Sequence, residues 1–421
     1  MIIMSPQKLL STLFFLLGCI AYSQEFDADI QLRPRFEYRN GYKNLLKENE
    51  SSTSFISQRS RLNINFKKEN LVTKLSLQNI RTWGEVPTIA TNDKNGIQVY
   101  EAWAQYAFDS KWRARVGRQI ISYDNQRIFG AIDWLQQGQS HDAAVLRFEN
   151  KNTNLDMGFA LNASAENLVA SAVAYTTTYK NMQYAHYNFA RNNLIMSLLF
   201  LNTAYEYSNA TNDIKLDYKQ TFGTFITYKK TKWNTDLSLY QQTGKSNGNI
   251  LNAINAAINF NYKLTNNLQA TIGYEYLSGK DQDDSNSKLR SFTPLFGTNH
   301  AFNGLMDYFY VGNHINNVGL KDAYLKLSYN AQKWQFALSP HLFYAAAKVL
   351  DESNTKMNSN LGSEIDFTTS FKVQKDILVQ AGYSQFFATK TLERLKSAPD
   401  SKTNNWCWIM VNINPKIFSS K

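Results

Sequence analysis

The stretch FDADIQLRPRFEYR, residues 26–39, decides the expected fold because its apolar and polar residues alternate along the chain. Neighbouring side chains of an extended strand point to opposite faces. Phe26, Ile30 and Phe36 therefore share one face, and Arg33 and Glu37 share the other. The first face suits contact with lipid and the second suits water.

The same period of two recurs at residues 59–67, 71–78, 100–108, 112–116 and 144–149. A lysine or arginine that faces lipid at mid-bilayer costs about 2–4 kcal/mol, whereas one that faces a wet lumen costs little. Aromatic residues make up 14% of the chain, which suits the aromatic girdles of a membrane barrel. We therefore expect an all-β protein, a transmembrane antiparallel β-barrel. A secreted soluble β-sandwich or propeller is the alternative, because it would show the same period.

Short polar turns, such as those at residues 68–70 and 150–152, alternate with longer polar loops, which is typical of outer-membrane barrels. Alternating segments number 16 to 18, and an even number is expected, so we predict 18 strands with short periplasmic turns and long extracellular loops. We expect no separate plug domain at the N-terminus. The expected long loops lie around residues 40–54, 83–96, 120–141, 208–217, 279–318, 348–358 and 389–403.

The N-terminus has the features of an export signal. About a dozen apolar residues end at Ile20, too few to span a bilayer as a helix, and Ala21 and Ser23 suit a cleavage site. We predict a signal peptide at residues 1–23 and an outer-membrane barrel at residues 24–421 in a Gram-negative cell.

Two cysteines are present, Cys19 and Cys407. Cys19 leaves open the alternative of a lipoprotein acylated at that residue. After cleavage at Ser23 only Cys407 would remain, so the fold is not held by an internal disulfide.

Arginine is concentrated near the N-terminus, where 11 of the 14 arginines precede residue 150. If the polar strand faces turn inward, one wall of the lumen is electropositive. The guanidinium fork pairs bidentately with carboxylates, which implies an anionic solute. Structural pairing with neighbouring Asp and Glu is the alternative. The proposed conduit residues are Arg33, Arg35, Arg59, Arg61, Arg113, Arg115, Arg118, Arg127, Asp133, Asp142 and Arg147.

The stretch TPLFGTNHAFNGLMDYF, residues 293–309, carries more apolar surface than a solvated loop should. We expect it to pack against the rest of the protein, either as a constriction inside the lumen or as a cap on the barrel end. The proposed gate residues are Gly297, Asn299, His300, Phe302 and Asp307.

The segments GRQIISYDNQRIFGAIDW (117–134) and SHDAA (140–144), with residues 293–309, resemble the alginate-export family of outer-membrane porins. The resemblance covers about residues 25–418. It implies an 18-stranded barrel with an arginine-rich constriction that passes polyuronate chains, and loops or turns that gate both ends. The family often has an Arg where this chain has Gln139. The matching positions are Gly117-Arg118-Gln119, Arg127, Gly130, Asp133-Trp134, Asp142, Gly297-Thr298-Asn299-His300, Phe302, Gly304 and Met306-Asp307.

The leading interpretation is a passive channel for anionic oligosaccharides or polysaccharides such as alginate-like polyuronates, with no enzymatic activity and no cofactor or metal. A general or small-anion diffusion porin is the alternative. An outer-membrane hydrolase or an adhesion barrel is a third alternative. For a hydrolase, Ser140, His141 and Asp142 are adjacent, and adjacent residues point in different directions. The acidic residues around Asp283 lack the glycine and distal Glu of a calcium-binding EF-hand, so we expect a solvated loop there.

The expected partners are outer-membrane lipids and the anionic polysaccharide, and either a solute gradient or a periplasmic partner gives transport its direction. We expect a monomer, and no nucleic acid as a partner.

Overall fold

The computed structural model describes residues 24–90, 92–309, 314 and 317–420. The predicted signal peptide, residues 1–23, lies outside the described residues, and so does Cys19.

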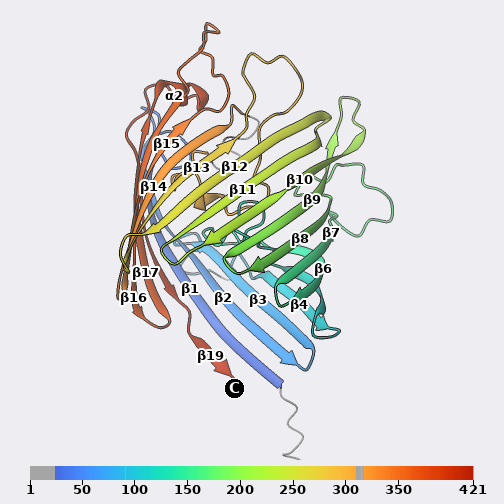
Figure 1. Ribbon diagram of the computed structural model, residues 1–421. Coiled ribbons are helices and arrows are strands. Elements are labelled where there is room, and N and C mark those ends of the chain that lie inside the picture. The colour runs from blue at the N-terminus through green and yellow to red at the C-terminus, as the bar shows by residue number, and fades with distance from the viewer. Residues whose placement is uncertain (1–23, 91, 310–313, 315–316, 421) are drawn as a thin grey trace, which may run out of the picture.

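The described chain forms one closed antiparallel β-barrel (Figure 1). Each strand pairs with the next in sequence, and the ring closes where β1 pairs with both β2 and β18. The short β19 extends β18 beyond Pro415 and also pairs with β1, so the wall has 18 strands, as predicted. The strands are β1 (Gln24–Asn40), β2 (Thr53–Lys68), β3 (Leu71–Thr82), β4 (Gln98–Ala107), β5 (Trp112–Gln119), β6 (His141–Asn150), β7 (Thr153–Leu161), β8 (Asn181–Arg191), β9 (Leu194–Ser208), β10 (Ile214–Lys229), β11 (Trp233–Ser246), β12 (Asn249–Lys263), β13 (Leu268–Leu277), β14 (Leu320–Ala331), β15 (Trp334–Tyr344), β16 (Asn360–Gln374), β17 (Ile377–Ala388), β18 (Asn404–Ile413) and β19 (Lys416–Ser419).

The alternation read from the sequence separates the two faces of the wall. In β1, Ile30 and Phe36 are exposed on the outer face, whereas Arg33 and Glu37 are buried on the inner face. Outward-facing aromatic rings also gather near the short turns, where Trp233 packs against Tyr228 and Phe260. This is the arrangement of an interfacial aromatic girdle.

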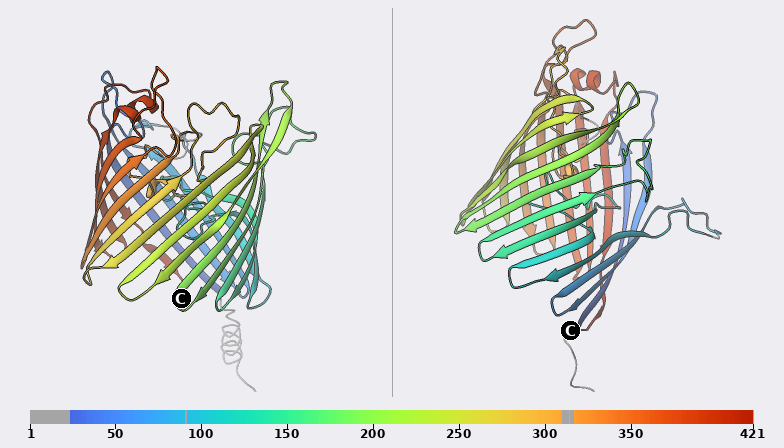
Figure 2. Two further views of the ribbon diagram at one scale, coloured as in Figure 1. Left: turned by 45° about the horizontal axis from the view of Figure 1, so that its top comes forward. Right: turned by 90° about the vertical axis from the view of Figure 1, so that its right-hand side faces the viewer.

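The two ends of the barrel differ in their connections. Short turns, such as residues 69–70 and 192–193, lie at the end where the described chain begins and ends. Long loops lie at the other end (Figures 1 and 2). In outer-membrane barrels the short turns face the periplasm. No helix among the described residues is long and apolar enough to cross a membrane.

The loop at residues 162–180, which joins β7 to β8, is absent from the loops expected above. Its Leu168, Val169 and Val173 are strongly exposed. Because this segment is as apolar as a strand, the sequence pattern does not mark it as a loop.

Two loops pass into the lumen (Figure 2). The first inward loop, residues 120–140, leaves β5, which has only 8 residues, and returns to β6, which has 10. The second inward loop, residues 293–309, belongs to the connection from β13 to β14 and contains the single-turn helix η1 (Asn299–Ala301). Of the two alternatives left open for the second loop, the structure shows a constriction in the lumen.

A short helix, α2 (Lys390–Leu395), lies in the connection from β17 to β18 (Figure 1). The Thr389 hydroxyl caps it by accepting a hydrogen bond from the Leu392 backbone N–H at 3.4 Å. Just after the helix, the Lys396 ammonium donates to the Tyr308 carbonyl at 2.7 Å. The helix therefore fastens the second inward loop from the side of the long loops.

Candidate channel constriction

The two inward loops are joined to each other by their backbones. The Phe296 N–H donates to the Ile128 carbonyl at 2.9 Å, and the Gly130 N–H donates to the Phe296 carbonyl at 2.8 Å. The rings of Phe129 and Phe296 stack with centroids 5.5 Å apart. Gln139 donates to the carbonyls of Gly130 and Phe296 at 3.0 and 2.8 Å, so the residue that departs from the family pattern helps to join the loops. The loops therefore form one packed unit.

Arg127 ties this unit to the barrel wall. Its Nε lies 2.8 Å from a carboxylate oxygen of Glu275 on β13, and its terminal nitrogens donate to Asn299 and Asn303 at 3.3 and 2.8 Å. The Phe302 ring lies 4.5 Å from the guanidinium carbon. Arg127 is only 2% exposed, so this predicted conduit residue fastens the loops and has little surface left for a solute.

Arg33 and Arg59 hold the first inward loop on the opposite side. They are direct partners on β1 and β2, so two positive charges face each other across the strand pair, an arrangement that is unfavourable by itself. Asp133 lies between them, 3.2 Å from Arg33 and 2.9 Å from Arg59. Arg33 also donates to the Leu135 carbonyl at 3.1 Å, and Arg59 to the Gln136 carbonyl at 3.3 Å.

The two partners differ in exposure. The Arg33 and Arg59 side chains are 4% and 1% exposed, whereas the Asp133 side chain is 60% exposed. The carboxylate therefore meets water while the guanidinium groups do not.

Arg35 continues the arginine row on β1. It pairs with Glu37 at 2.9 Å and donates to the Trp134 carbonyl at 2.6 Å, with its guanidinium 4.0 Å from the Trp134 ring. Trp134 in turn stacks on His300 of the second inward loop, with centroids 4.4 Å apart. Trp134 and His300 both belong to the motifs that resemble the family, but their contact joins segments that are far apart in the chain.

The remaining gate residues hold the second inward loop in place. His300 lies 2.8 Å from Asp307, and the Tyr42 hydroxyl donates to Asp307 at 2.5 Å. Burial, together with the Asp307 carboxylate, raises the pKa of the Tyr42 hydroxyl well above its usual value. At Gly297 a Cβ atom would lie 2.2 Å from the Arg127 carbonyl oxygen, so only glycine allows the two loops to approach this closely.

Further arginines line the wall between these contacts and the short turns. Arg61 donates to Gln78 at 2.7 Å and lies over the Tyr100 ring at 3.6 Å. Arg115 donates to Gln105 at 2.8 Å and lies over the Trp103 ring at 4.0 Å.

Arg113 and Arg147 are direct partners on β5 and β6, a second pair of opposed arginines. Arg113 pairs with Glu149 at 2.8 Å, and Arg147 pairs with Asp156 at 2.5 Å. These two side chains are 30% and 35% exposed, so they keep surface that faces the lumen.

Arg118 and Asp142 do not belong to this wall. They pair with each other at 2.8 Å and share the outer face with Val116 and Leu146, which are 60% and 36% exposed. The prediction that Arg118 and Asp142 line the conduit is wrong, because side chains of the same parity in a strand point the same way.

The Ser140-His141-Asp142 segment brings no catalytic group together. His141 is buried with Nδ1 3.0 Å from the Tyr179 hydroxyl, whereas the Asp142 side chain points outward to Arg118. The acidic loop residue Asp283 pairs with Lys348 at 2.7 Å. Within the described ranges no group of His, Cys, Asp and Glu is arranged to hold a metal ion.

Two partners of the arginines, Gln136 and Glu275, were not predicted, whereas the sequence already placed Glu37 on the same strand face as Arg33. Glu37, Gln136 and Glu275 hold Arg35, Arg33 and Arg127, and each is buried. The parity of Glu275 within its strand places it on the inner face, which was a usable signal. Gln136 lies in a loop, where strand periodicity gives none.

A closed 18-stranded barrel with an apolar outer face, a polar lumen and loops folded inward defines a channel protein of the outer membrane. The sequence profile described as alginate export matches residues 24–405, and the chain belongs to that family. Among curated proteins no relative matches.

Solved structures with the same fold include three from two bacteria. Acinetobacter baumannii OccAB4 matches with a TM-score of 0.64 at 12% identity, covering 94% of this chain and 98% of that chain. Pseudomonas aeruginosa OpdL matches with a TM-score of 0.62 at 12% identity over 93% and 99% of the two chains. Pseudomonas aeruginosa OccK11 (OpdR) matches with a TM-score of 0.59 at 11% identity over 93% and 96%. At such identities these likenesses show the fold alone.

Proposed function

We propose that this outer-membrane channel passes anionic oligosaccharides or polysaccharides, such as alginate-like polyuronates, along the arginine wall of its lumen. The arginine wall comprises the inward-facing arginines of β1, β2, β5 and β6. The observation that carries the proposal is the way two of them, Arg33 and Arg59, converge on the Asp133 carboxylate and nearby carbonyl oxygens. This site binds an acid of the chain's own loop, so its chemistry suits a uronate carboxylate.

Exchange of one carboxylate for another is the proposed opening step. Asp133 is the exposed member of its triad with Arg33 and Arg59. A solute carboxylate that replaces it keeps the two opposed arginines neutralised while the first inward loop moves away. The loop is thereby released without leaving two positive charges buried and unpaired, which would be strongly unfavourable.

Below the loops, Arg61, Arg113, Arg115 and Arg147 offer further sites along the same wall. Several weak sites allow a charged chain to move from one to the next, because conduction needs binding that is favourable but readily reversed. The partial exposure of Arg113 and Arg147 is consistent with weak binding of this kind. We propose that the barrel acts as a monomer, and that a periplasmic partner or the solute gradient supplies direction.

A general or small-anion diffusion porin is the second candidate function. It is favoured by the pairing of Arg113, Arg147 and Arg35 with carboxylates of neighbouring strand residues, which lowers the net charge of the wall. Such a channel would prefer small anions without recognising a sugar. A hydrolase has no comparable support in the described residues, since Asp142 faces away from His141.

Single-channel recording in a planar bilayer tests the proposal. We expect anion selectivity from the reversal potential in a salt gradient, and current block by oligouronates that the double variant Arg61→Ala/Arg115→Ala weakens. Arg118→Ala is the matched control, since it removes an arginine from the outer face. Selectivity for anions without block by oligouronates would leave the small-anion porin. A pore that is neither selective nor blocked would contradict both.

A further inference from the structure

A cavity in the lumen lies on the wall opposite the arginines. Its volume is about 370 Å³, and strands β12 to β16 supply its side walls. In a closed ring of 18 strands, β14 lies nine strands from β5 and therefore directly across the lumen. Phe302 and Asn303 of the second inward loop cover one end, and Gln269 and Ser328, close to the short turns, mark the other. The cavity thus extends from the underside of the loops toward the short-turn end.

The carboxylates in this cavity are engaged by the protein. Glu275 binds Arg127, and Asp322 accepts from His341 at 2.9 Å. Asp366 accepts from the Ser384 hydroxyl at 2.5 Å. All three carboxylates are almost fully buried, so they anchor the upper end of the cavity and offer little to a ligand.

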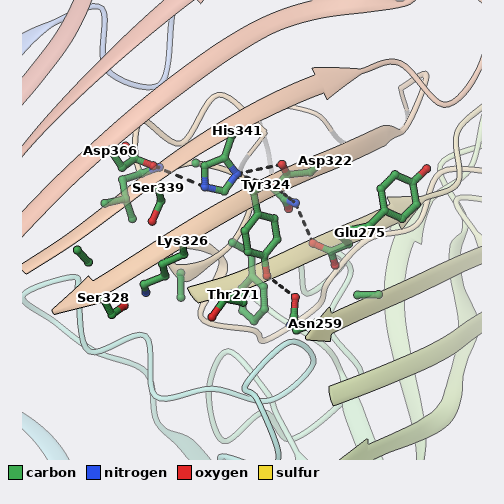
Figure 3. Close-up of a pocket in the computed structure, with 18 of the residues that line it drawn as sticks. Asn259, Thr271, Glu275, Asp322, Tyr324, Lys326, Ser328, Ser339, His341 and Asp366 are labelled. Atoms are coloured by element: carbon green, nitrogen blue, oxygen red, sulfur yellow. Dashed lines mark hydrogen bonds and ion pairs between the residues drawn. The ribbon is translucent and has the colours of Figure 1, made fainter. Parts of the chain in front are cut away.

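Tyr324 forms a flat wall in the middle of the cavity (Figure 3). Its hydroxyl donates to Asn259 at 2.5 Å, and its ring stacks with His341 at a centroid distance of 5.0 Å. The ring lies over Gly273, its direct partner on β13, where a Cβ would be 2.2 Å from a ring carbon. One ring face is therefore fixed against the wall and the other is turned to the lumen.

Among the described strands, three other aromatic rings lie over the glycine with which they pair directly. Tyr184, Tyr240 and Trp408 cover Gly158, Gly223 and Gly382, and each of these rings is buried. Tyr324 has the same support but remains partly exposed and lines the cavity. The first three rings fill space, whereas the face of Tyr324 is available.

The groups around this ring are suited to hydroxyls. Amides and hydroxyls line the cavity on both sides of Tyr324, and Lys326 stands on the short-turn side of it (Figure 3). Among the described lining residues Lys326 is the single lysine or arginine, and it is exposed. The polar side chains that lie near Tyr324 without an acidic or basic group are Asn259, Asn261, Gln269, Thr271, Ser328, Ser339 and Thr368.

We propose that this cavity is a saccharide-binding site that receives one pyranose ring of the transported chain. The sugar ring lies on the free face of Tyr324, its hydroxyls bond to the surrounding amides and hydroxyls, and a ring carboxylate, where present, meets Lys326. An apolar ring face beside oriented polar groups matches the two sides of a sugar. The proposal rests on the proposed function for the identity of the solute, and it adds a site that recognises the sugar instead of its charge.

Equilibrium binding to the full-length barrel in detergent tests this site by titration calorimetry, independently of whether the channel is open. The probes are a short oligouronate and a neutral glucose oligomer of matched length. We expect both to bind, and Tyr324→Leu to weaken both by about two- to tenfold because the platform is lost. Tyr324→Phe keeps the ring and should bind nearly as the native protein does. Tyr329→Leu, a tyrosine on the outer face of the same strand, is the matched control.

Lys326→Met provides a second variant at an exposed position, for use should Tyr324→Leu fail to fold. We expect it to weaken the oligouronate by about two- to fivefold and leave the neutral oligomer unchanged. If both Tyr324→Leu and Lys326→Met bind as the native protein does, the saccharide site is wrong. Loss of oligouronate binding in Arg61→Ala/Arg115→Ala would in that case still uphold the proposed function.

The remaining outcomes separate the two proposals. Neutral oligomer binding that depends on Tyr324, without any oligouronate binding, would uphold the site and contradict the polyuronate function. Absence of binding for both oligomers would overturn both.

Discussion

The arginine wall and the cavity wall on β12 to β16 present different chemistry to the same lumen. On the arginine wall, the chain's own Asp133 and loop carbonyls occupy Arg33 and Arg59. On the cavity wall, the carboxylates bond to other side chains of the barrel and loops, and a cavity of about 370 Å³ remains beside Tyr324. One wall is thus occupied by a loop, whereas a cavity is present at the other. Under the proposed function, displacement of Asp133 opens the channel, whereas sugar binding beside Tyr324 requires no movement of a loop.

Arg127→Met should have the largest effect on the docking of the inward loops, because Arg127 links the first inward loop to Glu275 on the cavity wall. It leaves Glu275 buried without its cation, and breaking a buried ion pair costs about 3–5 kcal/mol. We expect faster amide hydrogen exchange at residues 293–309 and a larger open-channel fraction.

The double variant Arg127→Met/Glu275→Gln serves as its control. It removes both charges, so it should recover part of the lost protection against exchange. Unchanged exchange in the single variant would show that Arg127 does not fasten the loop.

Asp133→Asn should sharpen the contrast between the walls, with the next largest effect. It removes the charge that neutralises Arg33 and Arg59, but the Asp133 side chain is 60% exposed, so we expect a loss of about 1–2 kcal/mol in loop docking. Open probability should rise, and oligouronates should bind more tightly because their competitor is gone. Asp142→Asn, on the outer face, should change neither quantity. A lower affinity for oligouronates in Asp133→Asn would argue against carboxylate exchange.

The sequence predicted the strands of the barrel wall well, but it predicted fewer of the contacts made by the loops inside the lumen. The alternation of Ile30 and Arg33 predicted the faces of β1 correctly, because a strand's period depends on local geometry. The same rule, applied across Gly117, would have placed Arg118 beside Val116 on the outer face. That correction was readable from parity alone.

Other contacts were not readable in this way. Arg127 and Asn299 are 172 residues apart in the chain, and loop residues have no period from which a partner follows. The position of Tyr324 over Gly273 depends on the pairing register of β13 and β14, which a shift of one residue would abolish.

Alkaline pH should loosen the loops with a smaller effect, through Tyr42. Burial and Asp307 raise its pKa well above the ordinary value of 10.0. At a pH below the ordinary pKa of 10.0, the Tyr42 hydroxyl is neutral whether the loop is docked or released. Above it the hydroxyl ionises only when released, so docking loses stability as pH rises beyond about 10.

The open-channel fraction, recorded between about pH 8 and pH 11, measures this loss. Tyr42→Phe should make the rise above pH 10 smaller. Some rise should persist, because burial also raises the pKa of Tyr123 in the first inward loop well above its usual value. An identical rise in the variant would exclude Tyr42 as a contributor.

Arg115→Lys should have the smallest effect, and it separates the two candidate functions of the arginine wall. The substitution keeps the positive charge but removes the planar fork, which bonds to Gln105 and lies over Trp103. Selectivity among small anions depends on charge and should be unchanged. Block by oligouronates should weaken by about two- to threefold, because bidentate pairing with a carboxylate is lost.

Arg113→Lys, whose partner Glu149 is 48% exposed, gives the comparison within the same strand. An arginine already paired with a carboxylate has less of its fork to offer a solute, so we expect its replacement to alter the block less than Arg115→Lys does. Equal block in both variants and in the native protein would mean that only the positive charge of the wall matters, and not the geometry of the guanidinium group. The channel would then be a small-anion porin, and any recognition of a sugar would have to come from the wall around Tyr324.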